Sequence, residues 1–310
     1  MVRKFYYLSL VALVALYLLI FIGGLVRATG SGMGCPDWPK CFGLWIPPTD
    51  VSELPPNYEE IFGKKLKGEV EFNVFKTWTE YLNRLAGVLV GLIILMTAFA
   101  AWFVHKRGNR KIWYASFIGL IMVIFQGWLG SKVVSNELLP VMVTLHMIVA
   151  LLMVYVYNYI YVHAKNEYKL SMAFELDNQS EFIAKILLLV TSLQILLGTQ
   201  VREVVDHLSL YTNIPRSEWS NNLGNIFYVH ILLASALIIL SYFLYRLEKR
   251  KKEMVNASVK WTFYLVIFEF ATGLVLYFFD ISRYAQPFHL VFSTIILGVL
   301  SIVLVRSKLR

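Results

Sequence analysis

Eight long apolar segments constrain this chain more than any other feature of its sequence. They cover roughly residues 5–26, 79–104, 112–134, 140–162, 182–201, 225–246, 259–279 and 286–305. Each one satisfies or approaches the ~20 residues that an α-helix needs to cross the hydrocarbon core. Of the 310 residues, 58% are hydrophobic and only 16% are charged. The sequence therefore predicts an all-α integral membrane protein with eight transmembrane helices, the first retained rather than cleaved as a signal peptide.

The basic residues predict how these helices are oriented. The net charge of +9 is concentrated in clusters such as residues 105–111 and 249–252, which lie between apolar segments. This is the distribution of positive-inside loops, and it argues against nucleic-acid binding. We expect both termini on the cytoplasmic side and the loops 27–78, 135–139, 202–224 and 280–285 outside. The short N-terminus lacks an Arg- and Ser-rich presequence, which favours a bacterial cytoplasmic (inner) membrane.

The predicted outer loop from residue 27 to residue 78 is the longest connection between helices. Its glycines and prolines favour irregular structure, and its aromatic residues favour a folded lid over a loose tether. Cys35 and Cys41 lie six residues apart in this loop, which suits a disulfide if the loop faces an oxidising compartment. No Cys-x-x-Cys motif is present, so a thioredoxin-like or covalent c-type haem protein is not indicated.

A polar group stands where the second apolar segment begins. Glu80, Asn83 and Arg84 lie within five residues of one another. Ionisable residues inside a membrane span are costly and usually mark a path for a substrate, an ion or a cofactor. The alternative is an interfacial ion pair between Glu80 and Arg84, with Asn83 as a contact between helices.

The chain also contains a weak internal repeat. The matched residues are 23–27 with 198–202, 80–83 with 227–230, 125–130 with 268–273 and 145–146 with 288–289. The repeat predicts two tandem pseudo-symmetric four-helix bundles in parallel orientation. We expect an N-terminal half at 1–162, a cytoplasmic linker at 163–181 and a C-terminal half at 182–310.

Three histidines stand inside apolar segments. His146, His230 and His289 lie four to six residues from the predicted outer ends of even-numbered helices, and so does Asn83. A haem iron accepts two imidazoles from facing helices, which makes His230 and His289 the natural pair. Zinc is less favoured, because no carboxylate or thiolate completes a tetrahedral set with these histidines. A proton relay through Glu269 would not explain the repeat.

Several charged residues near the outer helix ends could pair with haem propionates. The alternative for each of them is ordinary snorkelling of the charge to the interface. The candidates are Arg27, Arg84, Lys132 and Arg202. We expect His207 to lie in an outer loop beside Asp206, where it makes a hydrogen bond rather than a metal bond.

These motifs resemble a known family. Residues 23–41, Gly-Gly-Leu-Val-Arg-Ala-Thr-Gly-Ser-Gly-Met-Gly-Cys-Pro-Asp-Trp-Pro-Lys-Cys, resemble the first outer loop of haem A synthases. Residues 79–84 are similar to the Glu-x-x-His-Arg start of their second helix, and the remaining histidine positions match as well. The resemblance covers nearly the whole chain. It implies an enzyme with eight membrane helices in two halves, which oxidises the C8 methyl of haem O to the formyl group of haem A for terminal oxidase assembly.

The resemblance also implies roles for individual residues. The second half would hold haem b between His230 and His289. The first half would hold haem O in a pocket formed by Asn83, His146 and Arg84, with His146 as an axial ligand. Glu80 would lie beside the reacting methyl group, where it accepts a proton or stabilises a cation.

This chain departs from the family pattern at Asn83, where relatives have histidine. Because an amide is a poor iron ligand, the substrate iron would be held by His146 alone. The family also implies that Cys35 and Cys41 act as a loop brace or a redox contact. The second outer loop lacks the further cysteine pair of some relatives.

The expected partners are haem O, haem O synthase as its donor, and the lipid bilayer. The electron acceptor and a homo-oligomer stay open, and no nucleic acid is expected. Two other functions compete with the synthase. One is a membrane cytochrome b-type electron-transfer protein that oxidises a quinol, and the other is a non-catalytic haem carrier or oxidase assembly factor.

Overall fold

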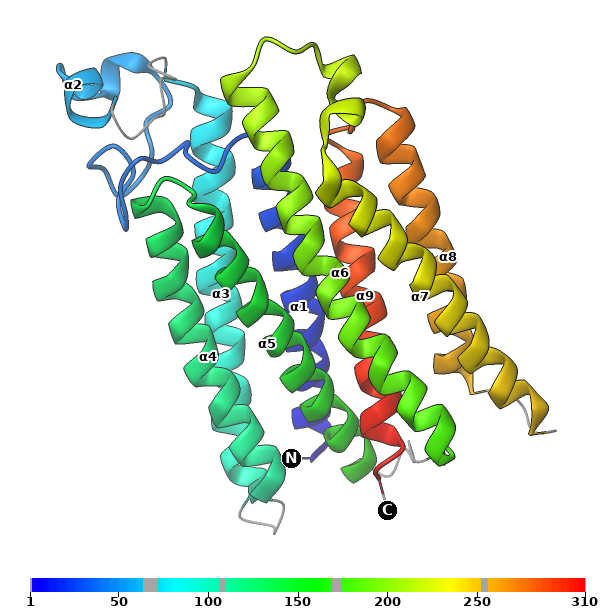
Figure 1. Ribbon diagram of the computed structural model, residues 1–310. Helices are drawn as coiled ribbons and strands as arrows, with labels where there is room; N and C mark the ends of the chain where they lie inside the picture. Colours follow the sequence, from blue (N-terminus) through cyan, green and yellow to red (C-terminus); the bar gives the residue numbers. More distant parts are fainter. Residues whose placement is uncertain (1, 64–71, 106–109, 169–173, 252–255, 310) are drawn as a thin grey trace.

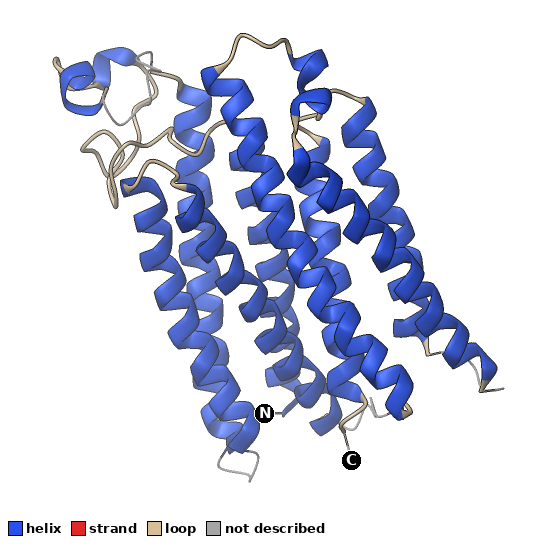
Figure 2. Ribbon diagram, in the orientation of Figure 1, coloured by secondary structure: helices blue, strands red, loops and turns tan. Residues whose placement is uncertain are grey.

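A computed structural model describes residues 2–63, 72–105, 110–168, 174–251 and 256–309. Eight helices in this part of the chain are long and apolar enough to span a membrane, which confirms the predicted all-α membrane fold. They are α1 (Val2–Ala28), α3 (Val74–His105), α4 (Arg110–Ser135), α5 (Pro140–Glu167), α6 (Asn178–Tyr211), α7 (Asn225–Arg250), α8 (Ala257–Phe278) and α9 (Ala285–Arg306). Three short helices, η1 (Val51–Glu53), α2 (Tyr58–Phe62) and η2 (Arg216–Asn222), lie between them. The described residues contain no strand (Figures 1 and 2).

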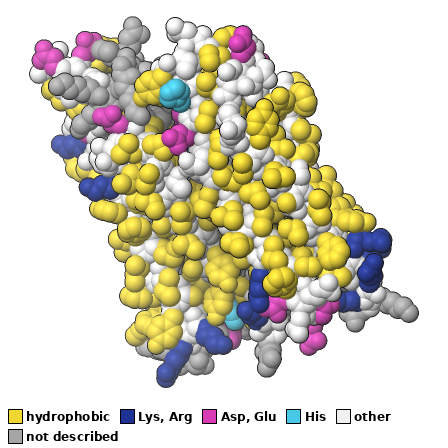
Figure 3. All heavy atoms as spheres, viewed as in Figure 1, with side chains coloured by type: hydrophobic (Ala, Val, Ile, Leu, Met, Phe, Trp, Pro, Cys, Tyr) yellow, Lys and Arg dark blue, Asp and Glu magenta, His cyan; other side chains and the backbone are white. Residues whose placement is uncertain are grey.

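The surface of the molecule matches a bilayer environment. Hydrophobic side chains cover the middle of the face in Figure 3, and most charged side chains lie toward its two ends. Both termini lie at one end of the helices, and the connection that contains α2 lies at the other (Figure 1). Because no water satisfies backbone groups inside hydrocarbon, each spanning segment stays helical throughout its apolar length.

Two helix ends differ from the sequence prediction. α3 begins at Val74 rather than near residue 79, and the Asn73 side chain accepts a hydrogen bond from Lys76 N at 3.0 Å, as an N-cap does. Glu80 therefore lies in the second turn of α3, not at its start. α6 ends at Tyr211 rather than near residue 201, because Val205 and Leu208 continue its apolar face and are buried against Trp219.

The predicted linker 163–181 is also shorter than expected. α5 continues to Glu167, and α6 begins at Asn178 with the Asp177 carboxylate accepting from Ser180 N at 2.7 Å. Residues 169–173 of this predicted linker lie outside the described residues.

The eight long helices pack as two rings of four. In the first ring α1 packs on α3, α3 on α4, α4 on α5 and α5 on α1. In the second ring α6 packs on α7, α7 on α8, α8 on α9 and α9 on α6. Within the described residues, neither α3 with α5 nor α7 with α9 forms a packed pair. These two diagonal pairs face each other across the interior of their rings.

Each helix ring has its own apolar core, and a third cluster, which contains Leu151 of α5 and Leu297 of α9, lies between the two rings. Tyr157 and Ile94 are buried in the first ring, and Leu187 and Leu300 in the second. α1 and α5 pack against α9, and α5 also packs against α6. The division into two tandem copies stays a prediction from the sequence.

Candidate functional site

One large cavity extends through the interior of both rings. Its volume is about 2120 Å³, and residues from all eight long helices line it. The side chains singled out in the sequence that line this cavity are Arg27, Glu80, Asn83, Arg84, His146, Arg202, His207, His230, Glu269 and His289. Lys132 is not among the lining residues.

His230 and His289 face each other from the diagonal helices α7 and α9. Their ring centroids are 6.4 Å apart, and their planes are inclined by 62°. An iron ion with an imidazole nitrogen about 2 Å away on each side would hold two such centroids roughly 6 Å apart. The spacing of these two rings therefore fits a six-coordinate haem iron.

A carboxylate also lies beside this pair. Glu269 Oε1 is 3.0 Å from His289 Nδ1, and Thr272 Oγ1 is 2.8 Å from the same nitrogen. Ser293 donates a hydrogen bond to Glu269 Oε1. Glu269, which the sequence offers only as a proton relay, therefore lies against one histidine of the pair. No group of three or more His, Cys, Asp or Glu side chains in the described residues is arranged to hold a metal ion.

The first ring presents His146 on α5 and Asn83 on α3. Gln126 of α4 donates from Nε2 to the carbonyl oxygen of His146 at 3.0 Å. His146 Nδ1 is buried and has no hydrogen-bond partner among the described residues. Asn83 and His146 both line the cavity from diagonal helices, so the first ring offers one imidazole where the second offers two.

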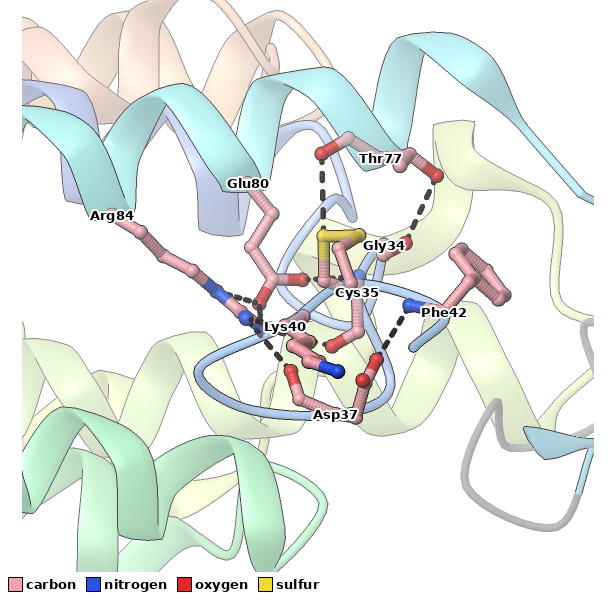
Figure 4. A network of polar contacts seen from close by, with 9 residues as sticks. Gly34, Cys35, Asp37, Lys40, Phe42, Thr77, Glu80 and Arg84 are labelled. Atoms are coloured by element: carbon pink, nitrogen blue, oxygen red, sulfur yellow. Dashed lines mark hydrogen bonds and ion pairs between the residues drawn. A yellow bond between two sulfur atoms is a disulfide. The ribbon is translucent and has the colours of Figure 1, made fainter. Parts of the chain in front are cut away.

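Glu80 holds the outer loop against α3, as Figure 4 shows. Glu80 is buried, with only 3% of the surface of the residue exposed. Glu80 Oε2 accepts a hydrogen bond from Cys35 N at 2.8 Å, and Oε1 pairs with Arg84. The Arg84 guanidinium also donates to the carbonyl oxygens of Cys35 at 3.0 Å, Asp37 at 2.7 Å and Lys40 at 2.9 Å. Glu80 and Arg84 therefore bind this loop as one unit while they line the cavity.

Cys35 and Cys41 form a disulfide, as their spacing suggested. Both are fully buried in a small apolar cluster with Phe42. The Asp37 carboxylate accepts from Phe42 N at 2.6 Å and from Gly43 N at 2.9 Å, which closes the disulfide loop on itself. The loop is thus folded by its own contacts as well as by its contacts with α3.

The loop touches the backbone of α3 at Gly34. Thr77 donates from its hydroxyl to Gly34 O at 2.9 Å, and a Cβ at Gly34 would lie 2.7 Å from Thr77 N. Because helix backbone cannot move aside, Gly34→Ala should push the loop away from α3 at a cost of about 1–3 kcal/mol. The expected result is faster reduction of the disulfide by dithiothreitol and a lower melting temperature.

The matched control for that substitution is Gly87→Ala on α3, where an added Cβ would meet no atom within 4 Å. It should leave the reduction rate and the melting temperature as in the unsubstituted protein. A Gly34→Ala protein with an unchanged reduction rate would contradict the close approach of loop and helix.

The predicted propionate partners are engaged with protein groups. Arg27 Nη2 lies 3.0 Å from Asp206 Oδ2, and Arg202 Nη2 lies 2.6 Å from Asp206 Oδ1. Arg202 also donates to Gln286 Oε1 at 2.7 Å. The Lys132 ammonium lies over the Trp128 ring, 5.9 Å from its centroid. Pairing of these residues with propionates stays a prediction.

Further positive charge lies at the outer end of the second ring. Arg216 of η2 donates to Asp280 O at 2.9 Å. Burial lowers the pKa of Arg216, and the nearby charge of Arg283 lowers it further. Such a concentration of cations at one rim suits an anionic ligand.

His207 lies elsewhere than expected. It belongs to the last turns of α6, not to an outer loop, because α6 continues to Tyr211. Its ring is 5.4 Å from the ring of Tyr211. The prediction that His207 lies in a loop is therefore wrong, because this residue is helical.

Sequence reasoning missed two groups of functional side chains. Asp206 binds Arg27 and Arg202 from different rings, and only its i,i+4 spacing from Arg202 is visible in the sequence. Gln126 and Gln194 contact the histidine-bearing helices, Gln194 Nε2 donating to His230 O at 3.0 Å. The match between 125–130 and 268–273 in the internal repeat was the signal for this second group.

The fold and the site define a polytopic membrane protein in which two interior histidines, His230 and His289, face each other across a ring of helices. The chain belongs to the COX15-CtaA family, described as cytochrome oxidase assembly protein, whose sequence model matches residues 6–301. The family resemblance of the sequence is thereby confirmed.

Individual relatives match over shorter stretches. The chain is 28% identical over 138 residues to a protein of Shewanella oneidensis named "Heme A synthase", covering 44% of this chain and 39% of that protein. A "Heme A synthase" of Alkalihalophilus pseudofirmus is 32% identical over 129 residues, 41% of this chain and 35% of its own length. One of Bartonella tribocorum is 31% identical over 124 residues, with 38% and 34% covered. The matched stretches thus span well under half the length of these relatives.

Proposed function

We propose that this chain is a haem A synthase that oxidises the C8 methyl of haem O to the formyl group of haem A. The family and the printed names of the relatives support this activity. The observation that carries the proposal is the His230–His289 pair, with its ring centroids 6.4 Å apart in a cavity that Glu80 also lines.

In the second ring, His230 and His289 would hold haem b through their imidazoles, and haem b would supply one-electron redox chemistry. Gly198 and Gly273 support the fit, because a Cβ at either position would lie 3.5 and 3.4 Å from Cε1 of the facing histidine. A larger side chain would therefore crowd the ring edge. Arg202 would pair with an anionic propionate at the outer rim.

In the first ring, His146 would hold the iron of the substrate, haem O, on one axial side. Asn83 replaces the second imidazole and leaves the other side open to exchange. Glu80 would accept a proton at its carboxylate, or stabilise positive charge that develops on the substrate methyl group. Arg84 and the N–H of Cys35 orient that carboxylate before substrate arrives.

We further propose the membrane in which this activity takes place and the enzyme that supplies its substrate. The basic loops support a bacterial inner membrane with both termini cytoplasmic, and the Cys35–Cys41 disulfide supports an oxidising outer side. A haem O synthase would supply the substrate.

One observation favours a second candidate, a non-catalytic haem carrier or assembly factor. Both carboxylate oxygens of Glu80 are occupied by the loop and by Arg84. A purely structural Glu80 would leave the first ring able to hold haem but not to oxidise it. An electron-transfer cytochrome b would likewise need only His230 and His289.

Pigment extraction separates these functions. Cells that contain a haem O source and this chain should yield haem A, while the same cells without the chain should yield only haem b and haem O. The reason is that neither a carrier nor a cytochrome changes the porphyrin substituent. Extracts with haem O and no haem A, from membranes that contain the folded protein, would reject the synthase.

A further inference from the structure

Each interior histidine faces the same short motif on the helix packed beside it. The motif is Gln or Glu followed four residues later by Gly, so both residues share one helix face. A Cβ at each glycine would lie 3.4 to 3.5 Å from Cε1 of the facing histidine. The three pairs are Gln126 and Gly130 of α4 against His146, Gln194 and Gly198 of α6 against His230, and Glu269 and Gly273 of α8 against His289.

The fourth helix pair, α1 with α3, lacks both the polar side chain of the motif and the histidine. The internal repeat aligns Gly23 of α1 with Gly198, which places Leu19 at the position of Gln194. On the packed partner α3, Asn83 occupies the position of His230. A polar side chain thus accompanies each of the three histidines and is missing where asparagine replaces the histidine. This is expected if the polar side chain forms a hydrogen bond with the imidazole.

At Glu269 the polar side chain of the motif contacts the facing histidine directly. Its Oε1 is 3.0 Å from His289 Nδ1, and Ser293 and Thr272 donate to the two carboxylate oxygens. Because an ionised carboxylate only accepts, a hydrogen bond between Glu269 and His289 requires the proton on Nδ1 of His289. The other ring nitrogen, Nε2, is then the one with a lone pair for a metal.

At the two glutamines, the side-chain oxygen of the glutamine and Nδ1 of the facing histidine both lack a hydrogen-bond partner among the described residues. Gln126 Oε1 and His146 Nδ1 are buried, as are Gln194 Oε1 and His230 Nδ1, and none has a hydrogen-bond partner among the described residues. Each glutamine is already tied to its histidine, because its Nε2 donates to that histidine's carbonyl oxygen at 3.0 Å. An amide oxygen accepts and an imidazole N–H donates, and buried groups of this kind are almost always paired.

We propose that Gln126, Gln194 and Glu269 are positioning residues whose side-chain oxygen holds Nδ1–H of the facing histidine and leaves Nε2 for a haem iron. This inference rests on the proposed function, because it needs haem at these histidines. The two axial ligands of haem b then differ, with a carboxylate behind His289 and a neutral amide behind His230. A carboxylate behind an imidazole makes it a more basic ligand, which favours oxidised iron and lowers the reduction potential.

The test is a redox titration of the haem b absorbance in the purified full-length protein. Glu269→Gln removes the charge and keeps the acceptor, so haem b should stay bound and its midpoint potential should become more positive. Gln194→Glu adds a charge behind His230, so the potential should become more negative. The matched control is Thr262→Val, which removes a buried hydroxyl of α8 that donates to Ser258 O at 2.9 Å, and it should leave the potential unchanged.

Opposite shifts from the two variants support the proposal, because loosened packing would not give opposite signs. If Glu269→Gln loses its haem through misfolding, Gln194→Glu alone decides by the sign of its shift. Unchanged potentials in variants that keep haem b would overturn this inference and leave the proposed function standing. Purified unsubstituted protein without any haem would overturn both.

Discussion

Replacing either His230 or His289 with alanine should empty the haem b site. The centroids of the two imidazoles are 6.4 Å apart across the interior of the second helix ring, so in the proposed site each would supply one bond to the same iron. Changes to the outer-shell partners of metal ligands already lower metal affinity ~10–100-fold. Loss of a ligand should therefore reduce the haem b retained per protein by at least ~10-fold, measured by the pyridine haemochrome spectrum of the purified protein.

His163→Ala is the matched control. His163 lies near the C-terminal end of α5. The centroid of its ring is 4.2 Å from that of Tyr159, and His163 does not line the cavity. It should keep the haem b content and spectrum of the unsubstituted protein. If His230→Ala and His289→Ala both keep a normal spectrum, the assignment of these ligands is wrong.

Removing the carboxylate of Glu80 should stop haem A formation while haem b remains. General acid–base groups contribute about 10²–10⁴-fold to rates, so Glu80→Gln should lower haem A in pigment extracts by at least ~100-fold. Glu80→Gln keeps a similar volume and an acceptor for Cys35 N–H, so the outer loop should stay in place. Haem b content should not change, because His230 and His289 lie in the other ring.

Asp37→Ala separates catalysis by Glu80 from the folding of the loop that Glu80 contacts. It removes the two hydrogen bonds to Phe42 N and Gly43 N and leaves Glu80 unchanged. If Glu80 acts on the substrate, Asp37→Ala should retain far more haem A than Glu80→Gln. Equal losses in both variants would assign Glu80 to the loop, and unchanged haem A in Glu80→Gln would exclude it from the chemistry.

The membrane fold could be predicted because it depends on composition along single segments. A run of about 20 apolar residues has no other stable state in a bilayer than a helix. The predicted helix ends were less accurate. α6 continues to Tyr211 because Val205 and Leu208 pack against Trp219 of η2, and that partner is distant enough in sequence to leave no local signal.

The candidate site was predictable in its residue types and in the pair His230 and His289, which lie at similar depth on two helices of the second half and face each other. The neighbour of His289 was not predictable, because the sequence offers Glu269 only as a proton relay and the structure places it against His289. Whether a polar side chain faces a neighbour depends on helix rotation and on packing, which the order of residues does not specify.

By itself the sequence determined the number of spanning helices, their approximate limits, the disulfide candidates and the family. Each of these depends on local apolar length or on a continuous motif. Only the tertiary structure decided that Glu80 and Arg84 form hydrogen bonds with the loop at Cys35. It also decided that Asp206 binds two arginines of different rings, and that the histidines of α7 and α9 face each other. Those contacts join residues far apart in the chain, and they exist only once the helices have packed.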